Sequence, residues 1–368
     1  MKIAQVCPTY YPSLGGVESH VQAISERLVE KGFETDVLTT DSTGNLPKQE
    51  TLNGVRILRF SSWAPSNAYH FSRELKTYLM ESSSNYEVIH AHSYHAMPAL
   101  YASQSKAGNK LVFAPHYHGT GHTLFRRLLH IPWKYYARQI FKKSDCIICV
   151  SNFERDLLIK NFGLEPRKVV FVPDGLNLQE FEVAARDKAA DLDKFRILCV
   201  SRLEKYKGIQ YLLRCLAGLE SNFALEVVGR GPYKRSLERE AVKLGVSSRV
   251  QFFEGVSREE LLTRYRNASV FVLLSKYEAF GIVVAEALAS GLPCIVSRTS
   301  ALAEWIDNKS CFGVDYPINL QKLSDVVTKI ARLPPIKRDR IMDWNEAADK
   351  ITRFYNALVR TGSPSGKS

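Results

Sequence analysis

Short apolar runs that resemble buried β-strands alternate with helical patterns along nearly all of the 368 residues. In the first half, the helical pattern at Val17–Lys31, ended by Gly32, separates the first two of these runs. Strands joined by helices favour a parallel sheet that is covered by helices on both faces. We predict strands in this half at Ile3–Val6, Thr35–Thr39, Val55–Phe60, Val88–His92, Lys110–Ala114, Cys146–Val150 and Val169–Val172.

The alternation stops once, at Pro173–Lys194, which is polar, acidic, rich in alanine and typical of a linker. Open parallel sheets bind ligands at the carboxyl ends of their strands. We therefore predict an α/β protein of two doubly wound, Rossmann-like domains, residues 1–180 and 181–343, that face each other across a ligand-binding cleft. Strands of the second domain are predicted at Arg196–Ser201, Ala224–Val228, Val250–Phe253, Val270–Leu274 and Cys294–Val296.

The composition fits a globular protein, with 45% hydrophobic residues and a formal net charge of +12. This charge suits an anionic partner, which can be a nucleotide, a nucleic acid or an acidic membrane surface. No nucleic-acid-binding motif is present, and no apolar run reaches the ~18 residues of a membrane-spanning helix. We expect a cytoplasmic protein, at most peripheral to the cytoplasmic face of a membrane. Cys146 and Cys149 lie three apart on a predicted strand and point to opposite faces, so reduced thiols are favoured over a redox or metal pair.

Paired glycines, Gly15 and Gly16, follow the first predicted strand directly. Glycines at a strand-to-helix turn let backbone N–H groups approach a ligand, and the amino end of a helix favours a phosphate. A tight turn without a ligand remains an equal alternative. The pattern is not the Gly-x-Gly-x-x-Gly of nicotinamide-dinucleotide proteins.

Two cations, Arg202 and Lys207, flank the turn that follows the first strand of the second domain. Gly208 ends this turn. At the carboxyl end of a strand, they are placed to hold a diphosphate. The alternative is solvated surface charge.

Two glutamates, Glu278 and Glu286, follow the strand that ends near Leu274, and Gly281 opens a helix between them. Glu286 lies in the otherwise apolar stretch Ile282–Ala289, where a carboxylate is costly unless it is hydrogen-bonded. Sugar hydroxyls are suitable donors, which favours a sugar site over an exposed helix carboxylate.

All nine histidines lie between His20 and His130. His90 and His92 are expected on one face of a strand end, as are His116 and His118. One buried histidine is commonly a core residue, but a cluster at two strand ends favours a site. The sequence shows no tetrahedral ligand spacing, so we predict no metal site.

These motifs, in this order, resemble the family-4 glycosyltransferases over nearly the whole chain. The resemblance implies a GT-B architecture, retention of anomeric configuration, a nucleotide-sugar donor held mainly by the second domain, and no essential metal cofactor. It also implies that a last helix, residues 344–360, packs back on the first domain. Pro173-Asp-Gly-Leu-Asn177 departs from the family's Pro-Asn-Gly-Val-Asp, so no role is assigned there. The residues that carry the resemblance are Gly15-Gly16, His116-Tyr-His118-Gly119, Val150-Ser151, Val172-Pro173-Asp-Gly175, Arg202 with Lys207, Val228-Gly229-Arg-Gly231-Pro232, and Glu278 with Glu286.

The resemblance implies that residues of this chain at positions matching the family's motifs have the family's roles. Arg202 and Lys207 would stabilise the diphosphate leaving group, Glu286 would bind the ribose, and His118 would lie beside sugar and acceptor. Catalytic roles are thus predicted for His118, Arg202, Lys207 and Glu278. Donor contacts are predicted for Gly15, Gly16, Ser275, Phe280, Gly281, Ile282 and Glu286 in addition, and acceptor contacts for Glu18, His20 and His116.

Basic and aromatic residues interleave in Leu124–Lys143. Such a helix can lie on an anionic membrane surface, with Phe125, Trp133 and Tyr136 as anchors; an ordinary core helix with a solvated basic face is an equal alternative. The basic positions concerned are Arg126, Arg127, Lys134 and Arg138.

We therefore predict a retaining glycosyltransferase that moves a sugar from a UDP- or GDP-linked donor to a hydroxyl or phosphate acceptor, in a lipid-linked or cell-surface glycan precursor. A sugar-nucleotide epimerase, a phosphorylase or a non-catalytic nucleotide-sugar-binding protein are the alternatives. A nucleic-acid partner is not expected.

Overall fold

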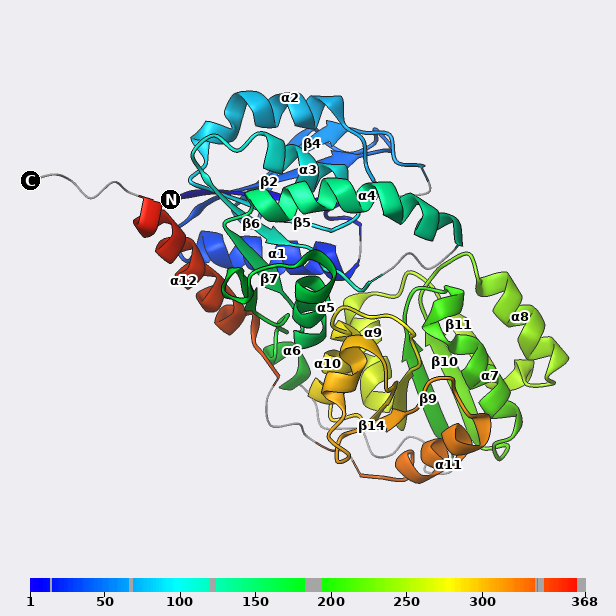
Figure 1. Ribbon diagram of the computed structural model, residues 1–368. Coiled ribbons are helices and arrows are strands. Elements are labelled where there is room, and N and C mark those ends of the chain that lie inside the picture. The colour runs from blue at the N-terminus through cyan, green and yellow to red at the C-terminus, as the bar shows by residue number, and fades with distance from the viewer. Residues whose placement is uncertain are drawn as a thin grey trace, which may run out of the picture. The chain divides into compact units, whose positions relative to one another are not determined.

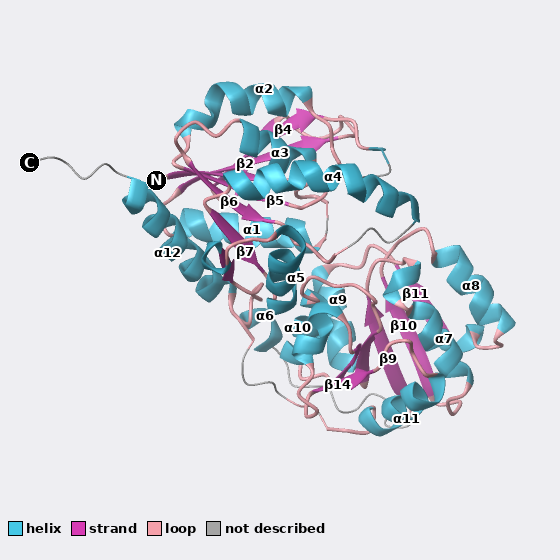
Figure 2. Cartoon of the chain, in the orientation of Figure 1, coloured by secondary structure: helices cyan, strands magenta, loops and turns pink. Residues whose placement is uncertain are grey.

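The computed structural model (Figure 1) describes residues 1–13, 15–65, 69–119, 124–182, 194–334, 336 and 341–362, and only the backbone of residues 124–131, 182 and 362. The chain forms two compact units. One comprises Met1–Gly175 with Met342–Ser368, and the other Leu176–Ile341. Each unit has its own, almost wholly parallel sheet (Figure 2). The predicted α/β class with two Rossmann-like domains is confirmed.

The sheet of the first unit has eight strands in the order β3-β4-β2-β1-β5-β6-β7-β8. β1 pairs in parallel with both β2 and β5, so the strand order reverses between β1 and β5. This reversal is the place where open α/β sheets bind ligands. The strands are β1 (Lys2–Val6), β2 (Glu34–Asp41), β3 (Gln49–Leu52), β4 (Val55–Ser61), β5 (Val88–His92), β6 (Lys110–Ala114), β7 (Cys146–Cys149) and β8 (Val169–Phe171).

β3 was not predicted, and it is the one strand of this sheet that runs antiparallel to its neighbour, β4. Its residues, Gln-Glu-Thr-Leu, are mostly polar and lack the apolar run of a buried strand. The turn that joins the two strands is Asn53-Gly54, in which both residues have positive φ. Asn-Gly is a strong hairpin signal, so the turn, unlike the strand, was visible in the sequence.

Helices cover both faces of this sheet. α3, α4 and α5 contribute Ala99, Phe141 and Leu158 to a core with β5 and β6, while α1 contributes Val21 to a smaller cluster on the other face. The bounds are α1 (Gly16–Glu30), α2 (Arg73–Ser82), α3 (Met97–Gln104), α4 (Leu124–Lys143), α5 (Asn152–Phe162) and the short 3-10 turns Ser83–Asn85 and Pro166–Lys168.

The last helix, α12 (Trp344–Gly362), belongs to the first unit although it follows the second in sequence. It lies beside α1, and its Tyr355 is fully buried. The Tyr355 hydroxyl lies 3.3 Å from Gln5 Nε2 of β1 and 2.7 Å from His90 Nδ1 of β5. Polar contacts as well as apolar packing therefore fix α12 against the sheet.

The sheet of the second unit has six parallel strands in the order β11-β10-β9-β12-β13-β14. This order reverses between β9 and β12, as in a dinucleotide-binding Rossmann fold. β14 was not predicted because its four residues include a glycine and two partly exposed positions. The strands are β9 (Phe195–Val200), β10 (Phe223–Val228), β11 (Val250–Phe253), β12 (Val270–Leu273), β13 (Cys294–Ser297) and β14 (Cys311–Val314).

Two apolar clusters flank the second sheet, one under α7 and α11 and the other under α9 and α10. The helix α6 lies inside the segment that was predicted as a linker. The bounds are α6 (Gln179–Glu182), α7 (Ile209–Ala217), α8 (Lys234–Lys243), α9 (Arg258–Asn267), α10 (Ile282–Ala289), α11 (Leu320–Ile330) and the 3-10 turns Lys205–Lys207, Ser247–Arg249 and Ser300–Trp305.

Among the described residues, no helix combines the length and apolarity that crossing a bilayer requires. All seven cysteines are buried free thiols, as expected from the sequence. Burial raises the pKa of Cys146 to about 12, which leaves its thiol unreactive.

Candidate functional site

In the second unit, the loops after β9, β10 and β12 pack backbone against backbone. Gly208 has φ +79, and a Cβ there would overlap the carbonyl of Leu274. A side chain on Gly229 or Gly231 would overlap the carbonyl of Ser201 or Leu203, respectively. Glycine is therefore required at all three positions, and the close packing brings the loop that carries the predicted cations to the end of β12.

Lys207 forms a largely buried ion pair with Glu278. Its Nζ lies 2.5 Å from Glu278 Oε1, and the two side chains are 10% and 16% exposed. Burial disfavours the charged ammonium, but the carboxylate of Glu278 outweighs burial and raises the pKa of Lys207 above its ordinary value. Lys207 is thus held as a cation. Arg202 Nη2 donates to the Tyr206 hydroxyl at 3.1 Å, and the Arg202 side chain is exposed.

The loop from Glu278 to Gly281 is fixed by the turn at Ser300–Trp305. The Glu278 N–H donates to Ser300 Oγ at 3.0 Å, and Trp305 Nε1 donates to the Phe280 carbonyl at 2.8 Å. Gly281 has φ +90 and precedes α10. The first N–H groups of α10, starting at the half-exposed Ile282, point out of the helix end and can donate to a ligand.

Ser275 lies at the end of β12 and is fully buried. Its carbonyl accepts from Ser297 Oγ at 2.5 Å and Thr299 Oγ1 at 3.1 Å. Its own Oγ has no hydrogen-bond partner among the described residues. A buried hydroxyl with an unmade hydrogen bond is uncommon, which makes Ser275 a candidate for contact with a ligand.

Glu286 is 8% exposed, and its carboxylate is already satisfied by the protein. Arg258 Nη1 donates to Oε1 at 2.5 Å, and the Tyr265 hydroxyl donates to Oε2 at 2.9 Å. The sequence argument that Glu286 needs sugar hydroxyls as donors is therefore wrong in its reason, because α9 supplies both donors. Each carboxylate oxygen still has a lone pair to offer a further donor.

In the first unit, Gly15 and Gly16 begin α1. Gly15 has an extended backbone, and a side chain there would overlap the carboxylate of Glu18. Glu18 in turn accepts a hydrogen bond from Thr9 Oγ1. Around Gly16, no described atom would contact an added Cβ. At the amino end of α1, the space beside Gly16 is thus open, while the Glu18 carboxylate lies against Gly15.

Three imidazoles of the first unit converge at the carboxyl ends of its strands. His92 ends β5, His116 follows β6, and His20 lies on α1. The ring centroids of His20 lie 5.4 Å from His92 and 5.1 Å from His116. One nitrogen from each ring lies within 4.8 Å of the others, a grouping that can hold a metal ion. Sequence spacing did not reveal it, because the three residues come from three separate elements.

Partners outside the cluster orient two of these rings. His20 Nδ1 lies 2.7 Å from Asp174 Oδ1, and His92 Nε2 lies 2.7 Å from Gln5 Oε1. Burial, followed by the charge of neighbouring imidazoles, lowers the pKa of His92 well below its usual value and that of His116 to about 3. His92 and His116 are therefore neutral at pH 7.

His90 and His92 share one face of β5, as predicted, with ring centroids 4.2 Å apart. The matching expectation for His116 and His118 is wrong. β6 ends at Ala114, and His116 has φ +49, so the twofold alternation of a strand no longer applies. The His118 ring instead lies 6.4 Å from that of His95.

The predicted membrane anchor Trp133 is not available to a membrane. Its side chain is 5% exposed, its Nε1 donates to the Tyr94 carbonyl at 2.7 Å, and its ring packs on Tyr69. The exposed aromatic residues of α4 are Tyr135 and Tyr136. Lys134 lies over the ring of Phe162, and Arg138 is exposed. The side chains of Phe125, Arg126 and Arg127 lie outside the described residues.

Several residues that complete these groups were missed. Arg258 and Tyr265 lie on α9, more than 20 positions before Glu286, and Asp174 lies 154 positions from His20. The acid-for-amide exchange at Pro173-Asp-Gly-Leu-Asn177 was the only signal, and it was left without a role.

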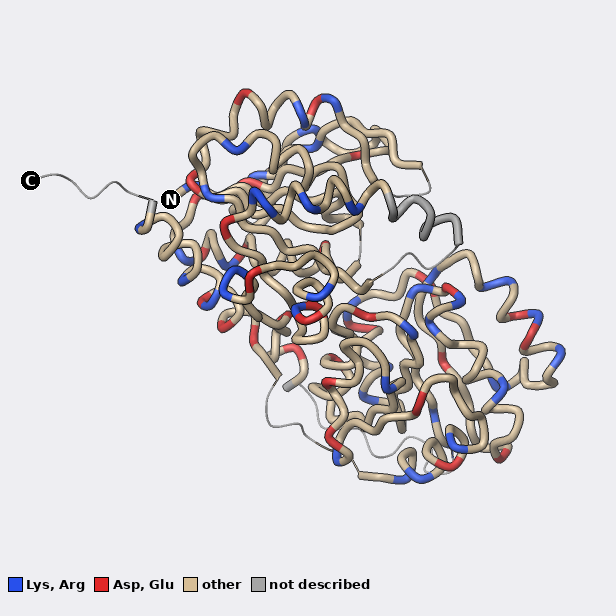
Figure 3. Tube along the Cα trace, viewed as in Figure 1, with Lys and Arg blue, Asp and Glu red and all other residues tan. Residues whose placement is uncertain are grey.

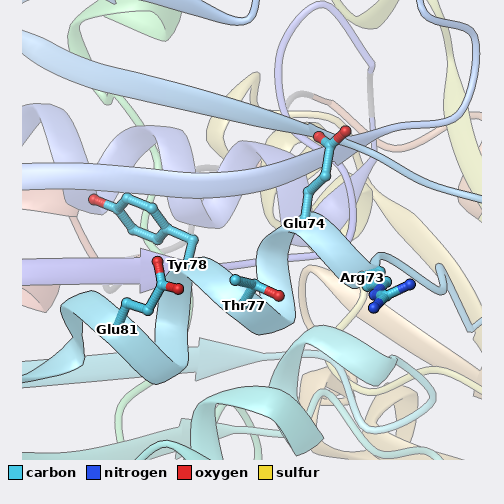
Figure 4. Close-up of a pocket in the computed structure, with 5 residues that line it drawn as sticks. All are labelled: Arg73, Glu74, Thr77, Tyr78 and Glu81. Carbon is cyan, nitrogen blue, oxygen red and sulfur yellow. The ribbon is translucent and has the colours of Figure 1, made fainter.

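A hollow lined by Arg73, Glu74, Thr77, Tyr78 and Glu81 runs along α2 (Figure 4). All five side chains come from this one helix. None of them belongs to the loops at the carboxyl ends of the strands, so this hollow is not taken as the site.

Two family models match the chain, each over about one half of it. A model described as "Glycosyltransferase Family 4" matches residues 14–180, and one described as "Glycosyl transferases group 1" matches residues 180–350. An uncharacterized glycosyltransferase of Methanocaldococcus jannaschii is 30% identical over 353 residues, covering 90% of this chain and 89% of the relative.

A GDP-mannose:cellobiosyl-diphosphopolyprenol alpha-mannosyltransferase of Komagataeibacter xylinus is 22% identical and covers 99% of this chain and 95% of its own. Among solved structures, sucrose-phosphate synthase from Thermosynechococcus elongatus superposes with a TM-score of 0.81 at 23% identity, covering 98% of this chain and 99% of the other. Its likeness shows the GT-B fold. Two family models that together span nearly the whole chain, and a full-length relative at 30% identity, identify the chain as a member of glycosyltransferase family 4.

Proposed function

We propose that this glycosyltransferase moves a sugar from a UDP- or GDP-linked donor to a hydroxyl or phosphate acceptor, with retention of anomeric configuration. The observation that carries the donor assignment is the buried cation Lys207, which ends the 3-10 turn Lys205–Lys207 after β9 and is paired with Glu278. Arg202 lies five residues before Lys207. A buried cation at this edge of a Rossmann sheet is placed to meet a diphosphate.

Cleavage of the bond between sugar and diphosphate leaves negative charge on the departing oxygens. Lys207 and Arg202 supply fixed positive charge for it, and because Glu278 orients the ammonium beforehand, little reorganisation is needed during the reaction. No step of this proposal uses a metal ion.

The sugar and nucleotide are assigned to the loop before α10. The N–H groups at Phe280, Gly281 and Ile282 and the unpaired hydroxyl of Ser275 are donors for sugar or phosphate oxygens. Glu286 is assigned to the ribose hydroxyls, which its remaining lone pairs accept.

The state of the two carboxylates bears on how a retaining reaction would proceed. Glu278 is paired with Lys207, and Glu286 with Arg258 and Tyr265. A carboxylate neutralised in this way is a weak nucleophile, which disfavours a covalent sugar–enzyme intermediate on either. With retention, which we propose on the resemblance to family 4, the acceptor attacks on the face from which the diphosphate leaves.

The acceptor is assigned to the first unit, with His118 as the catalytic side chain and Glu18, His20 and His116 around it. Gly15 and Gly16 of the same unit are assigned to the donor phosphates. The relative from Komagataeibacter xylinus acts, by its name, on a diphosphopolyprenol-linked sugar. This favours a lipid-linked glycan precursor as the acceptor class.

A lipid-linked acceptor requires access to a membrane surface. The described part of α4 carries recurring basic residues (Figure 3), with Arg138 and Lys142 exposed beside Tyr135 and Tyr136. We expect binding to anionic but not neutral liposomes, weakened by salt and by Arg138→Gln with Lys142→Gln. The control is Arg239→Gln with Lys243→Gln on α8, which removes the same charge; equal loss in both pairs would reject a surface on α4.

The proposal is tested by screening nucleotide sugars for thermal stabilisation and turnover, followed by NMR of the product anomer. Saturable turnover of one UDP- or GDP-sugar with an unchanged anomeric configuration is expected. Inversion would overturn retention, and product formation only from a sugar phosphate would favour a phosphorylase. The glycosyltransferase relatives already disfavour the epimerase and phosphorylase alternatives.

A further inference from the structure

The imidazoles of His20, His92 and His116 meet at the strand-order reversal of the first sheet. β1 is paired with β5 up to Val6 and Ala91, and His92 pairs with Ala114 at the end of β6. α1, which carries His20, follows β1. The cluster therefore lies where β1, β5 and β6 end, in the crevice that open α/β sheets use for ligands.

Among the residues that the structure describes, none is a hydrogen-bond partner of one buried nitrogen in each ring: His20 Nε2, His92 Nδ1 and His116 Nε2. His20 and His92 are 1% and 0% exposed. Buried nitrogens are costly to leave unsatisfied, so three of them in one small cluster indicate a missing common partner.

The outer hydrogen bonds set which nitrogens are lone-pair donors. His20 Nδ1 donates a hydrogen bond to Asp174 Oδ1, which leaves a lone pair on Nε2 of the neutral ring. Gln5 Oε1 accepts a hydrogen bond from His92 Nε2, which leaves a lone pair on His92 Nδ1. The Gln5 amide is in turn oriented by its hydrogen bond from Nε2 to the Tyr355 hydroxyl. A carboxylate or carbonyl on the outer nitrogen is the arrangement that orients histidine ligands of metal ions.

The backbone conformation of His116 also places its ring in the cluster. His116 adopts φ +49, a conformation unfavourable for a residue with a side chain. In this conformation its ring stacks on His92, at 5.9 Å between centroids, and meets His20 edge-on.

We propose that His20, His92 and His116 bind one divalent transition-metal ion of the Zn²⁺ class. Three neutral imidazoles suit Zn²⁺, Co²⁺ or Ni²⁺ rather than Mg²⁺ or Ca²⁺, which prefer oxygen. With metal–nitrogen bonds of about 2.1 Å, ligand nitrogens lie roughly 3.4 Å apart. The nitrogens here lie within 4.8 Å of one another, so the ring nitrogens approach one another by at most roughly 1.4 Å on binding.

The fourth coordination position opens beside His116, the one partly exposed ligand. An oxygen from solvent or from a phosphate can enter there, as in zinc sites with three protein ligands. Asp174 acts as a positioning residue, because it contacts the ligand His20 and not the metal.

The test uses tag-free, full-length protein stripped with chelator and dialysed. Co²⁺ is titrated with detection of its visible absorption, and Zn²⁺ by calorimetry and by competition for Co²⁺. We expect one equivalent per chain, with a Kd of about 1 µM or tighter. Mg²⁺ should neither bind at this level nor displace Co²⁺. The absence of saturable Zn²⁺ and Co²⁺ binding by the wild-type chain would overturn the proposal.

Variants assign the bound ion to this cluster. His116→Gln and His92→Gln should each weaken Co²⁺ binding at least 100-fold, and Asp174→Asn should weaken it by about 10–100-fold. The matched control is His95→Gln, a partly exposed histidine of the same unit outside the three, which should retain wild-type affinity.

Circular dichroism of the stripped variants separates loss of ligand from loss of fold. If His92→Gln does not fold, the loop variant His116→Gln decides. Unchanged Co²⁺ affinity in folded His116→Gln would overturn the assignment even if the wild-type chain binds one ion. Since the readout is metal binding, this result is independent of whether the chain proves to transfer a sugar.

Discussion

The ammonium of Lys207 lies 2.5 Å from a carboxylate oxygen of Glu278, and only 10% and 16% of the two side chains are exposed. The two residues are 71 positions apart and come from the loops after β9 and β12. Because these strands are neighbours in the sheet, the pair links the predicted diphosphate loop to the predicted sugar loop. The account of donor binding depends on this link.

Lys207→Met should destabilise the fold more than the loss of one surface charge would. It leaves Glu278 largely buried without its cation, at a cost of about 3–5 kcal/mol. Thermal unfolding of Lys207→Met, Glu278→Gln and the double variant measures the coupling. We expect the double variant to recover most of the loss; strictly additive losses would show that the two residues do not stabilise each other.

Glu286→Ala should raise the Kd for the donor nucleotide at least tenfold, since it removes a charged hydrogen-bond acceptor assigned to the ribose. Isothermal titration with UDP and GDP measures this effect. Tyr265→Phe is the control, because it removes a hydrogen bond to Glu286 without removing the carboxylate, and should change the Kd less. An unaltered Kd in Glu286→Ala would exclude its ribose role.

His118→Ala should lower turnover about 100-fold, within the range for a residue at the reacting groups, and leave nucleotide affinity unchanged. The reason is that His118 belongs to the first unit, whereas the donor contacts other than Gly15 and Gly16 belong to the second. His95→Gln serves as the control for a neighbouring ring. A loss of nucleotide affinity with normal turnover would show that His118 binds the donor and does not take part in transfer.

The loop that carries His116 and His118 should become less stable as the pH rises. Glu154 is fully buried and accepts the backbone N–H groups of Tyr117 and, at 2.9 Å, Val150. Burial raises its pKa to about 8 from an ordinary 4.5. The folded chain thus retains a proton that the unfolded chain releases, so this stabilisation is complete below about pH 4.5 and is lost as the pH rises through 8.

Melting temperatures of wild type and Glu154→Gln between pH 5 and 9 test this sign. The wild type should lose stability relative to the variant across this range. A difference that stays constant with pH would contradict the raised pKa.

Strand–helix alternation predicted both sheets because a strand buried on two faces is apolar throughout. The polar strand β3 and the glycine-containing β14 were not predicted, because neither is apolar throughout. In the site, Arg202, Lys207 and Glu278 were predictable because each follows a strand, and parallel strands end at one edge.

Partners from other elements were not predictable in this way. Arg258 contacts Glu286 from a neighbouring helix, and Asp174 contacts His20 across 154 positions. His116 turns toward His20 only because its backbone takes a positive φ. Trp133 was interpreted as an anchor because an amphipathic pattern does not say which aromatic residue faces the core. Such contacts depend on packing, which local sequence patterns do not encode.

The central claim is that Lys207 and Arg202 stabilise a departing nucleoside diphosphate. Its most direct measurement is kcat with the UDP- or GDP-sugar selected by the screen, for Arg202→Ala and Lys207→Ala beside the control Lys205→Ala, an exposed lysine of the same turn. The account predicts a loss of about 100-fold or more in each of the first two and near-normal kcat in the control. Near-normal kcat in folded Arg202→Ala and Lys207→Ala would contradict it.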